Sequence, residues 1–225
     1  MAVRSMAPSK RRFRHGAALS QRMRGAEKSQ CIEFAPPEDW YEPKDDNAPD
    51  YKIIVQKPGG GYRHVVTPQD IRHRLARLPA EALKPLEVIQ LSRMTRKKQS
   101  FPCYGMQWGS TLYLYPIEES LVEYYSRPPH PAQMNEARMY GGQWVQRGND
   151  EWKLVWSEAT IKDFYLNNIL IHELGHLLDN RNTSYTDRER YAEWFAIEHG
   201  FKTSQRRVSN SRPARKRIRR RHHAG

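Results

Sequence analysis

Two histidines and a glutamate that could do metal chemistry lie together in the stretch His-Glu-Leu-Gly-His, residues 172–176. His172 and His176 are four residues apart, so on an α-helix both imidazoles lie on one face, one turn apart, and can reach one ion. Zinc accepts neutral imidazole nitrogen at about 2.0–2.1 Å. Glu173 points roughly 100° round the helix, where its carboxylate can take a proton from a metal-bound water. The spacing therefore predicts a Zn²⁺ site with Glu173 as the catalytic base.

A third ligand must come from elsewhere in the chain, because a catalytic zinc normally has three protein ligands and one open position. The segment that follows offers Glu189 and Glu193, one turn apart on one face of a predicted helix. Thr186 and Glu189 also fit a capping box, in which Glu189 would only satisfy a backbone N–H and Glu193 would be the ligand. The residues alone leave Glu189 and Glu193 open as the third ligand.

Two helices must position these residues. Apolar positions mark a long helix from about Glu158 to Asp179, and because they occupy more than one stripe we expect it to be central and buried. A second helix is predicted from about Asp187 to His199, with Gly200 as its C-terminal cap. Gly175 costs about 1 kcal/mol in a helix interior, which indicates that another group approaches its backbone closely.

Strand patterns separated by turn residues precede these helices. Residues 51–66, with Pro-Gly-Gly-Gly at their centre, are predicted to form a hairpin, and Thr67 then caps a helix. Further strands are predicted over residues 86–91 and 111–115, and a second hairpin over residues 144–156. The layout predicts an α+β fold with a small mixed or antiparallel sheet, a central motif helix and a following ligand helix.

The segment His-Glu-Leu-Gly-His-Leu-Leu-Asp (172–179), followed by Glu-Arg-Tyr-Ala-Glu-Trp-Phe-Ala (189–196), resembles the gluzincin peptidases. The most similar are the anthrax lethal factor-like catalytic domains and the ImmA/IrrE metallopeptidases. The resemblance implies a zincin-like, minimal gluzincin domain over about residues 68–200 and zinc-dependent endopeptidase activity. It also implies that Glu189 is the third ligand, and that Glu193 and Asp179 orient zinc-bound histidines from the second shell of the site.

Other zincin features suggest further roles. In zincins generally the substrate lies along an edge strand above the motif helix, and the strand at 111–115 is the first candidate, with the Trp144 hairpin second. SprT-like proteases take their last ligand from a His-Gly pair, which His199 and Gly200 match, so this resemblance makes His199 a third candidate ligand. A histidine also suits a helix C-terminus electrostatically. Tyr185 and Tyr191 could donate to a transition-state oxyanion, although packing is the simpler interpretation of both.

The net charge of +13 is concentrated in the two ends of the chain. Residues 1–30 carry eight lysines and arginines and one acid, and residues 202–225 carry ten and no acid. Both basic tails are poor in apolar residues, so we expect them to be disordered. A solvated tail that aids solubility is one interpretation, and salt-dependent, sequence-independent nucleic-acid binding is the other. The residues that would bind nucleic acid are Arg215, Lys216, Arg217, Arg219, Arg220 and Arg221.

Residues 31–50 carry seven acids and four prolines and are predicted to be an acidic linker before a domain at 51–201. We expect a cytoplasmic protein with no membrane partner, because no apolar run could span a bilayer and no secretory signal is present. The predicted function is a zinc-dependent endopeptidase with a protein or peptide substrate, tethered to nucleic acid by its tails. The alternative is a nucleic-acid-binding protein with a structural or catalytically inactive zinc site.

Overall fold

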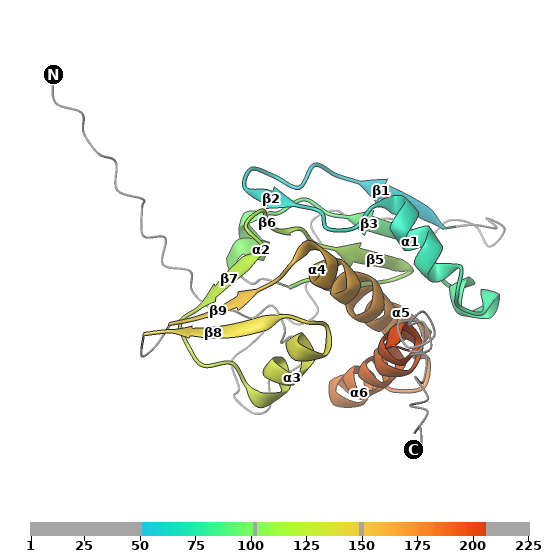
Figure 1. The fold of residues 1–225 in the computed structure, drawn as a ribbon. Helices are drawn as coiled ribbons and strands as arrows, with labels where there is room; N and C mark the ends of the chain where they lie inside the picture. Colours follow the sequence, from blue (N-terminus) through green and yellow to red (C-terminus); the bar gives the residue numbers. More distant parts are fainter. Residues whose placement is uncertain (1–50, 101–102, 149–150, 206–225) are drawn as a thin grey trace, which may run out of the picture.

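The computed structural model describes residues 51–100, 103–148 and 151–205. These residues form a mixed α/β fold in which helices pack against small sheets (Figure 1). The predicted basic tail at 1–30, the acidic linker at 31–50 and the Arg-rich stretch at 215–221 lie outside the described residues. In the part that the structure describes, no helix has the length and apolar character needed to cross a membrane.

The largest sheet has four strands, in the order β1 (Lys52–Val55), β3 (Val88–Leu91), β5 (Thr111–Leu114) and β4 (Gly105–Trp108). β1, β3 and β5 are parallel, and β4 is antiparallel to β5. Every residue of β3 and β5 is buried, as expected for strands with neighbours on both sides. Among the described strands β4 pairs with β5 alone, so β4 is an edge strand, and the short helix α2 (Arg96–Ser100) precedes it.

Two predictions about these strands are wrong. Residues 51–66 do not form a hairpin, because β1 pairs with β3 while β2 (Tyr62–Arg63) pairs with β6 (Ile117–Glu118). The glycine-rich turn permits a hairpin, but the pairing with β3 adds β1 to the core sheet. The strand at 111–115 is not an edge strand, since β5 lies between β3 and β4. The hairpin at 144–156, the second candidate for substrate binding, belongs to a separate sheet.

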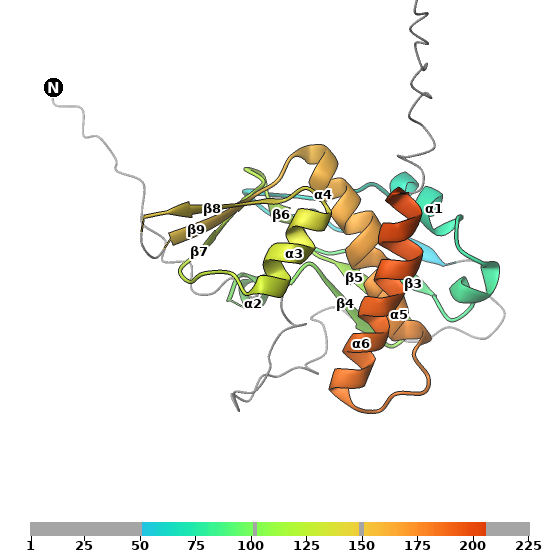
Figure 2. The same ribbon diagram turned by 60° about the horizontal axis from the view of Figure 1, so that its bottom comes forward.

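That separate sheet lies at the end of the molecule opposite α1 (Pro68–Leu75) in both views (Figures 1 and 2). Its strands, β7 (Val122–Tyr125), β9 (Glu151–Val155) and β8 (Gln143–Arg147), are antiparallel. The helix α3 (Pro131–Met139) packs against β8. The β8–β9 pairing confirms the predicted hairpin at 144–156. α1 begins at Pro68 with Thr67 as its N-cap, as predicted, and Thr67 forms a capping box with Asp70. A 3₁₀ helix, η1 (Ala80–Leu83), follows it.

The long helix predicted over residues 158–179 is present, with one irregularity. It consists of α4 (Glu158–Phe164), a π-helical turn η2 (Tyr165–Ile169) and α5 (Leu170–Leu178). α5 packs against β4 and β5, and residues 170–175 are all buried, which confirms the central position expected from its apolar surface. π-helical turns inside α-helices occur frequently next to functional sites, and this one directly precedes the histidine motif.

α6 (Tyr185–Phe195) runs beside α5 in both views and continues into a second π-helical turn, η3 (Ala196–Phe201) (Figures 1 and 2). The prediction that Gly200 caps this helix is therefore wrong. A Cβ atom at Gly200 would lie 1.8 Å from the backbone oxygen of Asn167 in η2, so only glycine lets the two π-helical turns touch. Arg74 of α1 is buried against the same point and donates to Asn167 Oδ1 at 2.6 Å.

Candidate metal centre and the edge strand beside it

Three side chains from neighbouring helices converge on one point. His172 and His176 lie one turn apart on α5, with 4.6 Å between their ring centroids. Glu189 reaches them from α6. Its Oε1 lies 3.1 Å from His176 Nε2, and its Oε2 lies 3.6 Å from His172 Nε2. One ligand atom from each residue lies within 4.8 Å of the other two, so this group could hold a metal ion.

The distances and burial of the group fit the requirements of zinc. Two tetrahedral ligands at about 2.0–2.1 Å from one ion lie about 3.3 Å from each other, and the two His–Glu distances fall on either side of that value. The three side chains are only 5%, 13% and 16% exposed, in the order His172, His176, Glu189. Glu189 Oε2 is buried and accepts no hydrogen bond from the described residues. A buried carboxylate oxygen is costly unless a donor or a cation compensates it.

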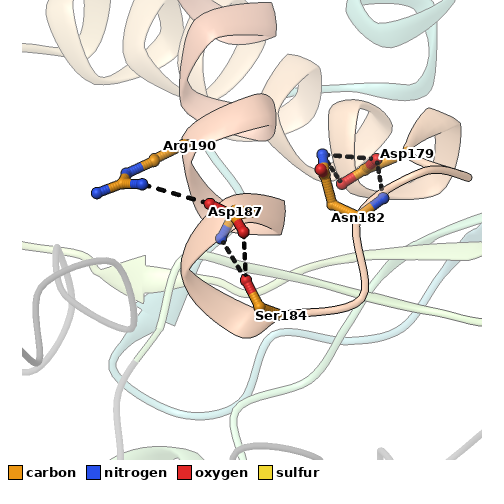
Figure 3. Close-up of polar contacts among 5 residues, drawn as sticks. All are labelled: Asp179, Asn182, Ser184, Asp187 and Arg190. Atoms are coloured by element: carbon orange, nitrogen blue, oxygen red, sulfur yellow. Dashed lines mark hydrogen bonds and ion pairs between the residues drawn. The ribbon is translucent and has the colours of Figure 1, made fainter.

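The start of α6 explains why Glu189 can face the histidines. Ser184 caps this helix, because its hydroxyl accepts the Asp187 N–H at 3.2 Å and donates to the Asp187 carboxylate at 2.7 Å (Figure 3). Asp187 also pairs with Arg190 at 3.3 Å. The capping-box interpretation of Thr186 and Glu189 is therefore wrong. Since Ser184 and Asp187 satisfy the helix terminus, Glu189 remains available to the metal centre.

α5 and α6 approach each other closely within the motif, at Gly175. A Cβ atom on Gly175 would lie 2.9 Å from Ala192 Cα and 3.1 Å from Phe195 Cβ. This contact is the close backbone approach that a glycine inside a helix indicated. It brings α6 near enough for the short Glu189 side chain to reach His176, the residue after Gly175.

The two other candidate ligands stand outside the group that the described residues form. Glu193 is exposed on α6. The predicted role of Glu193, orienting a zinc-bound histidine, is also disfavoured, because an exposed carboxylate is poorly placed to contact a buried ligand. His199 lies in η3, where its ring is tilted against Phe195 at 4.4 Å and its backbone oxygen accepts a hydrogen bond from Arg74. The geometry therefore favours Glu189 over both as the third ligand.

Asp179, expected to orient a histidine, instead organises the connection between α5 and α6. Its Oδ1 accepts the backbone N–H groups of Arg181 and Asn182 at 3.3 and 3.2 Å. Both its oxygens also accept from the Asn182 side-chain amide at 3.0 Å (Figure 3). Burial alone would raise the pKa of Asp179, but the hydrogen bonds from Asn182 and Arg181 together lower it. Asp179 therefore fixes the turn that leads the chain into α6.

Glu173 lies against the edge strand β4. It is 8% exposed. A Cβ atom on Gly105, the first residue of β4, would lie 2.9 Å from both Glu173 Cγ and Glu173 Oε1. Because glycine has no side chain, the backbone of the strand passes directly over the carboxylate. The sequence analysis missed this strand, although Gly109, with a φ of +56°, marks a tight turn between β4 and β5 that could have revealed it.

A basic residue and a thiol flank the start of β4, and the sequence analysis assigned neither to the site. Lys98 of α2 places its ammonium 3.1 Å from Cys103 Sγ and 4.2 Å from the centre of the Tyr115 ring. Burial raises the pKa of the Cys103 thiol, and the nearby Lys98 ammonium acts in the opposite direction. The charge of Glu173 also acts on this thiol, so Lys98 and Cys103 both belong to the surroundings of the Glu173 carboxylate.

Further along β4, Arg188 connects the strand to both helices of the site. Its Nη2 donates to the backbone oxygen of His176 at 3.3 Å and lies 3.5 Å from Gln107 Oε1. Arg188 directly precedes Glu189 on α6. The guanidinium therefore helps to hold together the three elements that carry the motif, the third ligand and the edge strand.

The two tyrosines considered as oxyanion donors have different surroundings. The Tyr191 ring lies 5.6 Å from that of Trp194 and 6.3 Å from that of Phe195, and the Arg181 guanidinium lies 5.7 Å over it. These contacts support the packing interpretation of Tyr191. Tyr185 is the first residue of α6 and is partly buried.

Comparisons of the chain with protein families, with curated proteins and with solved structures found no match. The site is therefore characterised by its own geometry. Two imidazoles and one carboxylate converge within reach of a single ion. A second buried carboxylate, Glu173, stands next to His172 in the chain and lies under the backbone of an edge strand.

Proposed function

We propose that this protein is a zinc-dependent endopeptidase of the gluzincin type, with a zincin-like domain. The observation that carries the proposal is the approach of Glu189, from a separate helix, to the two imidazoles of the His-Glu-Leu-Gly-His motif. His172, His176 and Glu189 would hold Zn²⁺, and three is the number of protein ligands typical of a catalytic zinc site. An edge strand above the motif helix is the arrangement expected of a zincin.

The residues around the site have distinct roles in peptide hydrolysis. When bound, zinc lowers the pKa of a water molecule and draws electron density from a carbonyl group. Glu173 accepts a proton from the attacking water and later donates it to the amine that leaves. The contact with Gly105 fixes the carboxylate in position, and its burial limits competing contacts with bulk water. Arg188 holds the edge strand at the site.

The substrate would bind along β4, not along the strand at 111–115. A peptide that adds to the free edge of β4 as an antiparallel strand gains main-chain hydrogen bonds whatever its side chains. Because Gly105 brings the strand against Glu173, the backbone of such a peptide would pass beside the catalytic base. The cleaved bond would therefore lie near Gly105.

The test compares Glu173→Gln with the full-length wild type. Wild-type protein should bind about one zinc per chain and cleave a mixture of random peptides, and a chelator should stop that cleavage. Glu173→Gln should keep its zinc and lose cleavage by about 10²–10⁴-fold, because the base is removed while the ligands remain. Glu119→Gln, at an exposed position, is the matched control and should behave as wild type. Equal cleavage by wild type and Glu173→Gln would refute the proposal.

We also propose that the C-terminal tail tethers the enzyme to nucleic acid, because residues 202–225 carry ten basic residues and no acid. Deleting residues 206–225 should weaken DNA binding and lower its dependence on salt, while zinc content and peptide cleavage stay unchanged. Unchanged DNA binding would exclude the tether.

The alternative function, a nucleic-acid-binding protein with a structural zinc, needs a fourth protein ligand. Within the described residues the group that could hold a metal ion has three members and not four, which favours the peptidase.

A further inference from the structure

We propose that the β4 edge selects peptides with acidic side chains two or three residues after the cleaved bond. This inference rests on the proposed peptidase function and specifies its substrate class. The selecting groups are the basic residues of α2, namely Arg96, Lys97 and Lys98. They precede β4 in the chain, and the Lys98 ammonium lies 3.1 Å from the Sγ of Cys103, two residues before the strand begins.

The chain segment that contains the proposed binding edge is basic. From Val88 to Ile117 the chain carries four lysines and arginines and no acidic residue. Three of the four lie together on α2, where Arg96 and Lys97 are exposed and Lys98 is partly buried. Exposed cations beside an acid-free strand attract anionic groups and repel cationic ones.

A short chain of contacts places α2 next to the catalytic base. The Lys98 ammonium lies 3.1 Å from Cys103 Sγ. Cys103 comes two residues before Gly105, and Gly105 passes directly over Glu173. α2 therefore lies at the beginning of the strand that would bind the peptide, on one defined side of the cleaved bond.

The strand direction decides which part of the peptide meets these cations. A peptide antiparallel to β4 runs from the Trp108 end of the strand toward the Gly105 end, so the part after the cleaved bond approaches α2. Cys103 is two residues before Gly105, which corresponds to about 6–7 Å along an extended strand. Acidic side chains should thus be favoured at the second and third positions after the cleaved bond. At the first position the negative charge of Glu173 opposes them.

The first experiment reads the preference from cleavage sites. Full-length, zinc-loaded protein is incubated with peptides that are randomised around a central segment, and the products are sequenced by mass spectrometry. We expect Asp and Glu to be enriched about 3–10-fold at the second and third positions after the cut. The double variant Arg96→Glu with Lys97→Glu should lose or invert this enrichment. The control variant, Lys84→Glu with Arg147→Glu, makes the same charge change at exposed sites directly after η1 and on β8 and should keep the enrichment.

The second experiment measures binding without turnover. In the Glu173→Gln background, a labelled peptide with two aspartates at these positions should bind about 5–20-fold more weakly when Arg96 and Lys97 are both changed to Glu. The difference should shrink between 50 and 200 mM salt, since the charges are exposed. A peptide with alanines in place of the aspartates should lose little.

The outcomes separate the inference from the function on which it rests. If wild type cleaves peptides without acid enrichment, or if the α2 variant keeps the enrichment, the specificity is refuted while the peptidase stands. If zinc-loaded wild type cleaves nothing, the proposed function fails and the specificity fails with it.

Discussion

At the scale of single residues, Glu189 decides whether the two histidines form a metal centre. Its carboxylate lies 3.1 and 3.6 Å from their Nε2 atoms, whereas Glu193, one turn further along the same helix, is exposed. Glu189→Ala should therefore weaken zinc binding by more than about 100-fold, the upper range for the loss of an outer hydrogen-bond partner. Glu193→Ala should change it little. Competition with a chromogenic chelator measures both affinities.

This comparison contains its own control, because both substitutions remove the same side chain from the same helix. Glu189→Ala also removes a buried carboxylate oxygen that accepts no hydrogen bond from the described residues, so the zinc-free variant should remain folded. A loss of zinc in Glu193→Ala with retention in Glu189→Ala would reverse the assignment of the third ligand.

The residue scale also shows which parts of the site could be predicted from sequence. His172, Glu173 and His176 lie on one helical turn, so their relative positions follow from helix geometry alone. Glu189 required the packing of two helices, and the local pattern around Thr186 allowed a capping role just as well. Only the observed cap at Ser184 and Asp187 separates the two interpretations. Asp179 is similar, since its position beside the motif gave no sign that its oxygens accept from Arg181 and Asn182.

At the scale of elements, the separation of α5 and α6 is set by Gly175. Gly175→Ala should increase helix propensity by about 1 kcal/mol. The new Cβ atom would nevertheless lie 2.9 Å from the backbone of Ala192, and overpacking of this kind typically costs about 1–3 kcal/mol. We expect α6 to move away from α5 and zinc binding to weaken by about 10-fold or more, because Glu189 moves with α6.

Gly60→Ala provides the control for that substitution, because no atom lies within 4 Å of the position its Cβ would take. Zinc affinity and urea unfolding should be measured for both variants. Zinc affinity equal to that of wild type in Gly175→Ala would show that the helix separation does not govern the site.

The elements themselves were predictable where their signals are local. The long motif helix, the helix after Thr67 and the hairpin at 144–156 follow from apolar periodicity and turn residues, and all three are present. The pairing of β1 with β3 and the edge position of β4 were not predictable in this way. Both depend on contacts between segments far apart in the chain, and β4 is only four residues long. For this reason the strand predicted to bind substrate, at 111–115, differs from the edge strand of the structure, β4.

At the scale of the whole molecule, Glu123 joins the two larger sheets. It lies on β7 of the three-stranded sheet, and its Oε1 accepts from Tyr104, which directly precedes β4, at 2.6 Å and from Trp156 at 3.1 Å. Burial raises the pKa of Glu123 from 4.5 to about 7, although both hydrogen bonds act against this rise. Near neutral pH the molecule therefore holds a carboxyl group that resists ionisation at the contact between its sheets.

The raised pKa makes this contact weaken as the pH increases. Between about pH 4.5 and 7 the folded state keeps a proton on Glu123 that the unfolded state has released. The contribution of Glu123 to the free energy of unfolding is fully present below about pH 4.5, falls between about pH 4.5 and 7, and stays low above about pH 7. A shift from 4.5 to about 7 corresponds to on the order of 3 kcal/mol. Glu123→Gln should remove this dependence, because the amide oxygen can accept the same two hydrogen bonds without a charge.

We therefore expect Glu123→Gln to raise the free energy of unfolding by about 1–3 kcal/mol at pH 8 and to change it little at pH 4.5. Urea unfolding is measured for the variant and the wild type, both saturated with zinc. The metal ligands titrate in the same way in both proteins, so their effect cancels in the difference between the two free energies of unfolding. Glu119→Gln, at an exposed position close in the chain, should shift stability by less than about 0.5 kcal/mol at either pH. An equal gain at both pH values would mean that the gain does not come from the ionisation of Glu123, and a loss at pH 8 would mean that its ionised form strengthens the contact between the sheets.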